Sequence, residues 1–153
     1  MANTYTQMNV HAVFSVKGRG NFISDKWSEQ LHRYIAGTLN ETNNYSLAVN
    51  GYRDHVHIFF ELSTSCSVST VLQNVKSKSS KWINQQRLAG GKFEWQTGYS
   101  AFTYSRSQRE NVINYIIDQK RHHGKRSFKD EYLELLRKNE IEYDDAYLFD
   151  FYD

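Results

Sequence analysis

Apolar and polar residues alternate most clearly between Gly51 and Leu62. One side of an extended chain there would carry Val56, Ile58, Phe60 and Leu62. The other side would carry His55, His57 and Glu61, because successive strand side chains point to opposite faces. The pattern therefore predicts a strand whose apolar face is buried. Its other face holds two neighbouring imidazoles, and neutral imidazole is the commonest protein metal ligand.

The same kind of alternation predicts further strands over residues 4–15, 45–52 and 101–105. Apolar residues at helical spacing predict helices over residues 24–40, 67–88, 108–122 and 128–138. Ser107 with Glu110 is typical of a capping box, and Ser127 of an N-cap. The order β-α-β-β-α-β, followed by helices, predicts an α+β fold of the ferredoxin-like (split βαβ) type. We expect a four- to five-stranded antiparallel sheet with helices on both faces.

Length and composition favour one folded domain over residues 1–153, with residues 127–153 as a C-terminal helix and acidic tail. Hydrophobic residues make up 39% and aromatic residues 15%, which excludes a disordered chain. The single Cys66 excludes an internal disulfide and a multi-cysteine zinc site. No leader and no membrane-spanning run is seen, so a soluble cytoplasmic protein is the default expectation.

Charge is distributed unevenly along the chain. Residues 1–128 contain 16 Lys and Arg against 8 Asp and Glu, whereas residues 129–153 contain 3 against 9. A basic body fits a polyanion such as nucleic acid, although a solvated surface is the simpler reading. The candidate DNA-binding residues are Lys17, Arg19, Arg53, Lys76, Lys78 and Lys81. Three aromatic residues, Phe93, Trp95 and Tyr99, could stack on bases or pack against the core.

Tyr115 and Gln119 are four residues apart and share one face of the predicted helix over 108–122. A tyrosine hydroxyl is a weak nucleophile that a divalent cation or a general base could activate. Gln119 could lend an amide oxygen to the same cation. Each residue alone means little, because a helical Tyr is usually core and a Gln usually solvated. We expect His122 and His123 to contact phosphate or lie on the surface.

Two motifs together make the chain resemble one family of DNA-cutting enzymes. His55-Val56-His57 resembles the His-hydrophobe-His motif of the HUH endonucleases. With Tyr115-x-x-x-Gln119 in a later helix, the chain resembles the single-tyrosine HUH transposases of small bacterial insertion sequences, which are related to REP-associated tyrosine transposases. The stretches 11–17, 76–82 and 119–128 also resemble that family, so the resemblance spans nearly the whole sequence.

The resemblance implies an enzyme that cuts and rejoins single-stranded DNA at hairpin-marked element ends. His55, His57 and Gln119 would bind Mg²⁺ or Mn²⁺. Tyr115 would attack the phosphate, leaving a 5′-phosphotyrosine and a free 3′-hydroxyl, so that rejoining needs no ATP. The resemblance also implies a homodimer without a membrane partner. Whether Tyr115 acts in cis or in trans stays open.

Three other interpretations use parts of the same pattern. His55-x-His57-x-x-x-Glu61 fits the metal spacing of cupins, although the long predicted helices and the absence of proline disfavour a small β-barrel. A ferredoxin-like sheet can also bind single-stranded RNA, but the strands lack the aromatic motif of that module. A domesticated, non-catalytic hairpin-binding protein is the third alternative. Glu61 fits a carboxylate that supports the metal ligands as well as a surface charge at a strand end.

Overall fold

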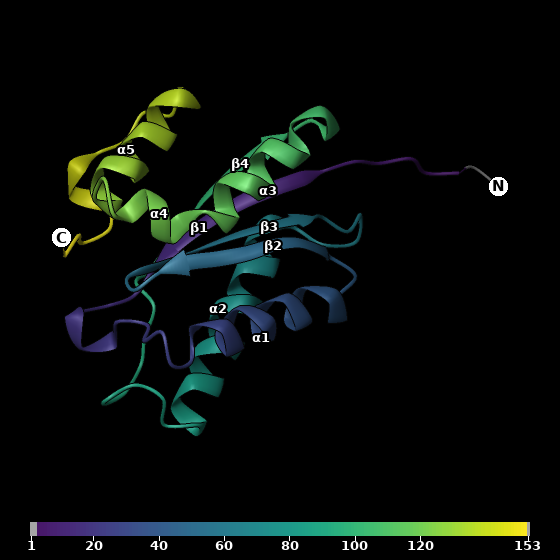
Figure 1. Cartoon of the computed structure of the whole chain (residues 1–153). Helices are drawn as coiled ribbons and strands as arrows, with labels where there is room; N and C mark the ends of the chain where they lie inside the picture. The colour runs from purple at the N-terminus through teal and green to yellow at the C-terminus, as the bar shows by residue number, and fades with distance from the viewer. Residues whose placement is uncertain (1–2, 153) are drawn as a thin grey trace.

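Four antiparallel strands form one sheet in the computed structural model, which describes residues 3–152 apart from the side chain of His122 (Figure 1). The strands are β1 (Asn9–Ser15), β2 (Tyr45–Tyr52), β3 (His55–Glu61) and β4 (Ser100–Tyr104). Their order across the sheet is β2-β3-β1-β4. This is the ferredoxin-like order, and it places the strand with the two histidines in the middle of the sheet.

Helices cover both faces of this sheet, as the sequence predicts (Figure 1). One face is covered by α1 (Ser28–Glu41) and α2 (Val68–Gln85). The other is covered by α3 (Arg109–Ile117), α4 (Gln119–His123) and α5 (Phe128–Lys138). Short 3₁₀ turns occupy Arg19–Asn21, Arg106–Gln108 and Asp145–Tyr147. None of the helices within residues 3–152 has the length and apolar character needed to cross a membrane.

The main core lies between the sheet and the α1–α2 layer. Val56, Ile58 and Phe60 of β3 are fully buried in it, as the alternation predicts. Helix α1 contributes Leu31 and Ile35, which lie four residues apart and therefore on one face of the helix. Burying each of these large side chains stabilises the fold by about 1.5–3 kcal/mol.

A second apolar layer covers the histidine face of the sheet. Phe59 of β3 packs with Val112 and Ile116 of α3. Val13 of β1 packs with the apolar face of α5, which begins at Phe128. The side chains on both faces of β3 are therefore buried, and its two histidines lie inside the protein instead of on an open surface.

The predicted continuous helix over residues 108–122 is wrong. Ser107 does not cap it, because the Ser107 hydroxyl bonds the Ser105 hydroxyl at 2.7 Å and α3 begins without a side-chain cap. The helix ends at Ile117, where Asn50 of β2 donates its amide to the carbonyls of Ile116 and Ile117 at 3.0 and 2.8 Å. These bonds satisfy carbonyls that a continuous helix would use internally, so α4 begins separately at Gln119.

Other boundaries differ by a few residues. The first strand begins at Asn9 instead of residue 4, and the first helix begins at Ser28. A turn precedes that helix, because the Ser24 carbonyl accepts hydrogen bonds from the amides of Trp27 and Ser28. The predicted cap of α5 is confirmed: the Ser127 hydroxyl accepts from the amide of Asp130 at 3.1 Å.

Candidate functional site

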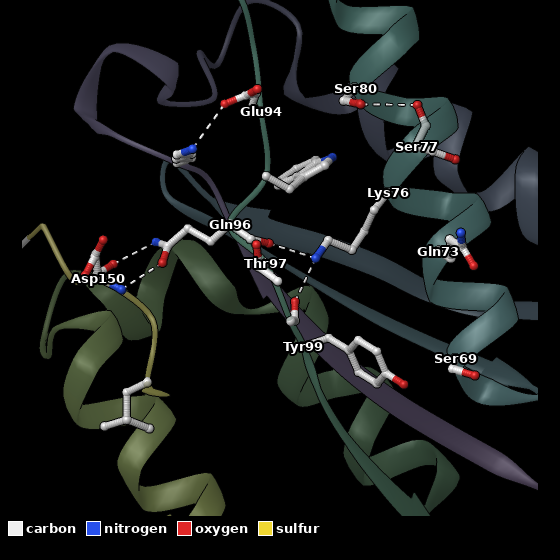
Figure 2. Close-up of a pocket in the computed structure, with 14 residues that line it drawn as sticks. Ser69, Gln73, Lys76, Ser77, Ser80, Glu94, Gln96, Thr97, Tyr99 and Asp150 are labelled. Atoms are coloured by element: carbon white, nitrogen blue, oxygen red, sulfur yellow. Dashed lines mark hydrogen bonds and ion pairs between the residues drawn. The ribbon is translucent and has the colours of Figure 1, made fainter. Parts of the chain in front are cut away.

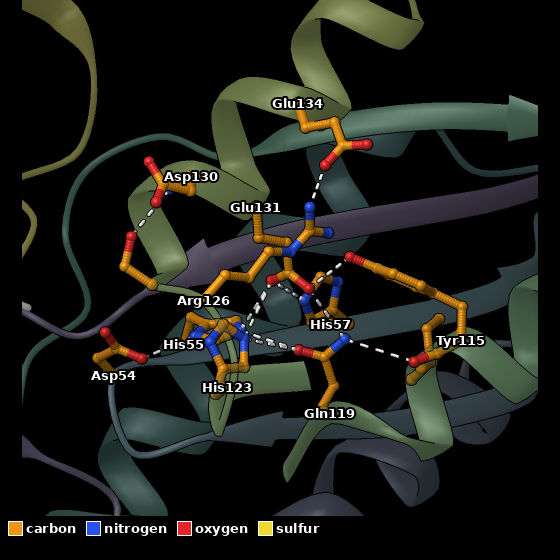
Figure 3. Close-up of polar contacts among 12 residues, drawn as sticks. Asp54, His55, His57, Tyr115, Gln119, His123, Arg126, Asp130, Glu131 and Glu134 are labelled. Carbon is orange, nitrogen blue, oxygen red and sulfur yellow. Dashed lines mark hydrogen bonds and ion pairs between the residues drawn. The ribbon is translucent and has the colours of Figure 1, made fainter. Parts of the chain in front are cut away.

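His55 and His57 project from β3 toward the layer formed by α3, α4 and α5 (Figure 3). Both side chains have no exposed surface, and their ring centroids are 5.0 Å apart. The His55 ring stacks on Phe128 of α5 at 3.9 Å, with 4° between the ring planes. The strand alternation and the α5 contact together fix where both imidazoles point.

Each of these histidines is held through its Nδ1 atom. The Asp54 carboxylate lies 2.7 Å from Nδ1 of His55, and His11 Nε2 of β1 lies 2.8 Å from Nδ1 of His57. Asp54 is the residue before β3, and His11 sits on the neighbouring strand. Such partners fix the orientation of a metal-ligating histidine and leave its Nε2 atom available to bind the metal ion. Nδ1 of His11 has no hydrogen-bond partner among the residues that the structure describes.

Glu131 of α5 brings a carboxylate to the Nε2 atoms. Its Oε1 lies 3.2 Å from Nε2 of His57 and 3.4 Å from Nε2 of His55. Glu131 is fully buried. The sequence analysis missed this role, although a signal existed: Glu131 lies three residues after Phe128 and four before Leu135, within the apolar stripe of α5. A carboxylate in such a stripe is buried only with partners.

Gln119 and His123 complete the cluster from α4. The Gln119 amide oxygen lies 3.1 Å from Nε2 of both His55 and His123. His123 Nε2 is also 3.2 Å from Oε1 of Glu131, and its side chain is only 2% exposed. The expectation of a surface position for His123 is therefore wrong. The Tyr52 ring, which stacks on it at 5.0 Å, accounts for part of this burial.

Tyr115 reaches the same cluster from α3. Its hydroxyl donates a hydrogen bond to Glu131, and its ring lies edge-on to His57 with 5.8 Å between centroids. Burial raises the pKa of Tyr115 well above its ordinary value, and the negative charge of Glu131 raises it further. The structure thus brings His55 and His57 together with Tyr115 and Gln119, a pair about 60 residues later in the sequence, around one carboxylate.

The donor set fits a divalent cation. One ligand atom each from His55, His57 and Glu131 lies within 4.8 Å of the others, and Gln119 adds a neutral oxygen. Nitrogen together with carboxylate and amide oxygen suits Mn²⁺ and related ions, and the oxygens also suit Mg²⁺.

Without a cation, protons must balance the Glu131 charge. Burial alone would lower the pKa of His55, but its hydrogen bonds to Asp54 and Glu131 prevail and raise it to about 9. For Glu131, burial alone would raise the pKa. The charge of His57 and the hydrogen bonds from His123, His55 and His57 instead hold it well below its ordinary value.

Glu61 lies outside this cluster, although it shares the histidine face of β3. Its carboxylate pairs with the Arg109 guanidinium at 2.9 Å, and the same guanidinium donates to the Asn9 side chain. The Glu61–Arg109 pair joins the end of β3 to the start of α3. Of the two expectations for Glu61, the strand-end charge is the one that the geometry supports.

Two of the candidate DNA-binding lysines line a groove of about 780 Å³ between α2 and the segment over residues 94–99 (Figure 2). The Lys76 ammonium donates to the carbonyls of Gln96 and Gly98 at 2.8 and 2.7 Å, so it holds that segment in place. Lys17 pairs with Glu94 at 3.4 Å, and both side chains are exposed. The groove wall on α2 carries Ser69, Gln73, Ser77 and Ser80.

The other four candidates lie outside this groove, and two of them, Lys78 and Lys81, line a second pocket together. Arg19 donates to the Tyr152 carbonyl at 3.1 Å, and Lys78 pairs with Glu41 at 3.6 Å. The Arg53 guanidinium lies over the Phe22 and Tyr52 rings, beside the turn before His55. The pocket of Lys78 and Lys81 is also lined by Tyr34 and Trp82.

The three aromatic residues of the loop after α2 differ in exposure. Phe93 and Trp95 are buried, which confirms the packing interpretation for both of them. Tyr99 is 37% exposed and lines the groove between α2 and residues 94–99. Tyr99 is therefore the one of the three with a ring accessible for stacking.

Comparison with known proteins gives one family. A family model described as IS200-like transposase matches residues 4–119. Among solved structures, a protein assigned as a transposase from Deinococcus radiodurans R1 superposes with a TM-score of 0.60 at 16% identity, over 78% of this chain and 95% of that one. A REP-associated tyrosine transposase bound to a REP hairpin superposes with a TM-score of 0.59 at 12% identity, over 81% of this chain and 73% of that one. No curated protein sequence matches this chain.

At these identities the two structures show a shared fold. The family match covers about three quarters of the sequence and includes β3 with both histidines, all of α3 and the first residue of α4. The chain therefore belongs to the family of IS200-like transposases.

Proposed function

We propose that this transposase cuts and rejoins single-stranded DNA through a covalent bond to Tyr115. Membership of the family implies an enzyme that cleaves DNA. One observation carries the proposal. The Tyr115 hydroxyl donates a hydrogen bond to the Glu131 carboxylate, which also faces the Nε2 atoms of His55 and His57. A nucleophile and a set of metal ligands thus meet at one point, as a phosphoryl-transfer site requires.

We infer that His55, His57 and Gln119 hold a divalent cation, Mg²⁺ or Mn²⁺. When bound, such an ion would polarise the scissile phosphate and stabilise the negative charge that develops on it. Asp54 and His11 keep the two imidazoles oriented before any ion arrives, through bonds of 2.7 and 2.8 Å. The entropic cost of ordering these side chains is therefore incurred during folding, before the ion binds.

The Tyr115 oxygen forms the new bond to phosphorus as its proton passes along the hydrogen bond to the Glu131 carboxylate. The bond from phosphorus to the 3′-oxygen breaks, and the departing oxygen takes up that proton. The products are a 5′-phosphotyrosine and a free 3′-hydroxyl. Because the phosphotyrosine is still a phosphodiester, the 3′-hydroxyl of another strand can reverse the step without ATP. Tyr115 is partly exposed whereas the ligand side chains are buried, so we infer that DNA approaches from the Tyr115 side.

We infer that Tyr115 acts in cis, because it contacts Glu131 and His57 of its own chain. A homodimer stays a prediction. Mixing Tyr115→Phe with His57→Ala separates the two modes. If the tyrosine acts in cis, the mixture stays inactive. If it serves a partner's histidines, a mixed dimer regains one complete site, and restored cleavage would overturn the cis assignment.

Hairpin DNA is the substrate that we propose, since one similar structure is bound to a REP hairpin. On this chain, the groove along α2 offers Ser69, Gln73, Ser77 and Ser80 to a sugar–phosphate backbone. Hydroxyl and amide side chains make such contacts, which fix the register of a strand without reading its sequence.

A gel assay tests the central step. The protein is mixed with Mn²⁺ and labelled single strands from the flanks of its own gene, and a denaturation-resistant protein–DNA band is sought. We expect the band with wild type and with Tyr45→Phe, which removes an exposed hydroxyl on the edge strand β2. Tyr115→Phe or chelator should abolish the band. A band that persists in Tyr115→Phe would contradict the proposal, and hairpin binding without any band would identify a domesticated binder.

A further inference from the structure

The family match ends at Gln119, yet the site continues beyond it. Helix α5, which begins at Phe128, adds the buried carboxylate of Glu131. The two oxygens of this carboxylate have different neighbours. Oε1 faces the Nε2 atoms of His55, His57 and His123, whereas Oε2 accepts hydrogen bonds from the Tyr115 hydroxyl and from the Gln119 amide at 3.2 Å.

We propose that Glu131 binds the divalent cation through Oε1 and positions Tyr115 through Oε2, so that one carboxylate links the cation to the nucleophile. The cation would then have a charged ligand in addition to His55, His57 and Gln119. The role given to Tyr115 rests on the proposed function, whereas the cation ligand can be tested without DNA.

Distances support the ligand role. Two ligands that occupy neighbouring positions on one ion, with bonds of about 2.1 Å, lie about 3 Å apart. Oε1 of Glu131 lies 3.2 Å from Nε2 of His57 and 3.4 Å from Nε2 of His55. Small shifts of these side chains would bring all three atoms to one cation.

Hydrogen-bond roles support it as well. His55 donates from Nδ1 to Asp54, because an ionised carboxylate can only accept. The Asp54 bond occupies Nδ1, so it is Nε2 of His55 that faces Oε1 of Glu131, at 3.4 Å. Either a proton or a metal ion must lie between these two atoms. Among the described residues, the ion pairs of Glu131 are with imidazoles, whereas the Arg126 guanidinium, whose charge also acts on Glu131, pairs with Glu134. A divalent cation satisfies both atoms at once.

A purely structural role is the competing explanation. Glu131 could tie α5 to the sheet through protonated imidazoles, with no part in cation binding. The two explanations differ in one measurable quantity, the cation affinity of the protein without DNA. They also differ in whether the effect of substituting Tyr115 on that affinity depends on the presence of Glu131.

Calorimetric titration of the metal-free, full-length protein with Mn²⁺ tests the ligand role. We expect Glu131→Gln to bind Mn²⁺ at least about tenfold more weakly, since even residues that only support a ligand change affinity about 10- to 100-fold. Asp130→Asn is the matched control, because it removes the same charge from an exposed position on the same helix. It should bind within about twofold of wild type. Unchanged affinity in Glu131→Gln, or no Mn²⁺ binding by wild type, would overturn the ligand role.

Glu131→Asp is the second variant, in case Glu131→Gln does not fold by circular dichroism. It keeps the charge but withdraws the oxygens by one methylene, so we expect a similar loss of Mn²⁺ affinity. Affinity equal to wild type would count against the ligand role.

A double-mutant cycle with Tyr115→Phe tests the link. We expect this substitution to change Mn²⁺ affinity more than about twofold in wild type and not at all in Glu131→Gln. Equal effects in both backgrounds would overturn the link. Because no DNA is present, these results are independent of the covalent-band assay, so either proposal can fail while the other stands.

Discussion

The Tyr115 hydroxyl donates its hydrogen bond to a carboxylate 16 residues later in the chain, Glu131. Between them lie the end of α3, the whole of α4 and the loop that leads into α5. The candidate nucleophile is therefore held by a different helix from its own. No single segment forms the site, because β3, α3, α4 and α5 each supply at least one group to it.

Mn²⁺ should stabilise the folded chain. A ligand at 100 times its Kd adds about 2.7 kcal/mol, which corresponds to a rise in Tm of roughly 5–10 °C for a chain of this size. Calorimetric melting with Mn²⁺ and then with chelator measures the shift. The Mn²⁺-induced rise in Tm should be mostly lost in His57→Ala and retained in Asp130→Asn. An equal shift in His57→Ala would contradict the assignment of this ligand.

Asp54 should matter for cation affinity although it is not among the proposed ligands. Its carboxylate holds His55 through Nδ1 at 2.7 Å. Asp54→Ala should weaken Mn²⁺ binding about 10- to 100-fold, as loss of such a partner does elsewhere. Asp54→Asn should lose less Mn²⁺ affinity, because its amide oxygen can still accept the hydrogen bond from Nδ1 of His55. If Asp54→Ala titrates like wild type, the orienting role is wrong.

Salt dependence should identify phosphate contacts. If Lys81 touches one DNA phosphate, Lys81→Ala lowers the slope of log affinity against log salt by about 0.7–0.9. Lys129→Ala, an exposed lysine on α5, is the charge-matched control and should leave the slope unchanged. Binding of the gene's flanking hairpins at several salt concentrations measures both. Identical slopes for the two variants would remove Lys81 from the DNA interface.

His32 should make folding sensitive to acid. Burial, and then the nearby Lys120, lower the pKa of His32 to about 4 from its ordinary 6.5. Between these values the unfolded chain binds a proton that the folded chain does not, so the free energy of unfolding falls as pH drops from 6.5 toward 4. The loss is at most about 3 kcal/mol. His32→Gln should flatten urea-measured stability over this range, and an unchanged slope would contradict the assignment.

Much of the fold follows from local pattern. The alternation in β3 assigns Val56, Ile58 and Phe60 to one layer and both histidines to the other, and the structure buries them accordingly. This succeeds because the strand period alone decides the face. The four-residue spacing of Tyr115 and Gln119 likewise brought both to the cluster, even though α3 ends between them.

The remaining site residues depend on tertiary packing. Glu131 and His123 enter the cluster only because α4 and α5 fold back over β3, and nothing in their own periodicity sets that direction. The end of the helix at Ile117 could not be predicted from local sequence either, because it depends on a hydrogen bond from the Asn50 side chain on β2. Glu131 did leave one local signal, a carboxylate within the apolar stripe of α5.

Mass spectrometry of the protein–DNA adduct tests the central claim most directly. The protein is incubated with Mn²⁺ and single-stranded hairpin flanks of its gene, then digested with protease and nuclease. We predict one modified peptide, with a nucleotide joined through its 5′-phosphate to Tyr115, and no such peptide when chelator is present. Attachment to another residue, such as Tyr104, or strand cleavage without any adduct, would contradict tyrosine catalysis at this site.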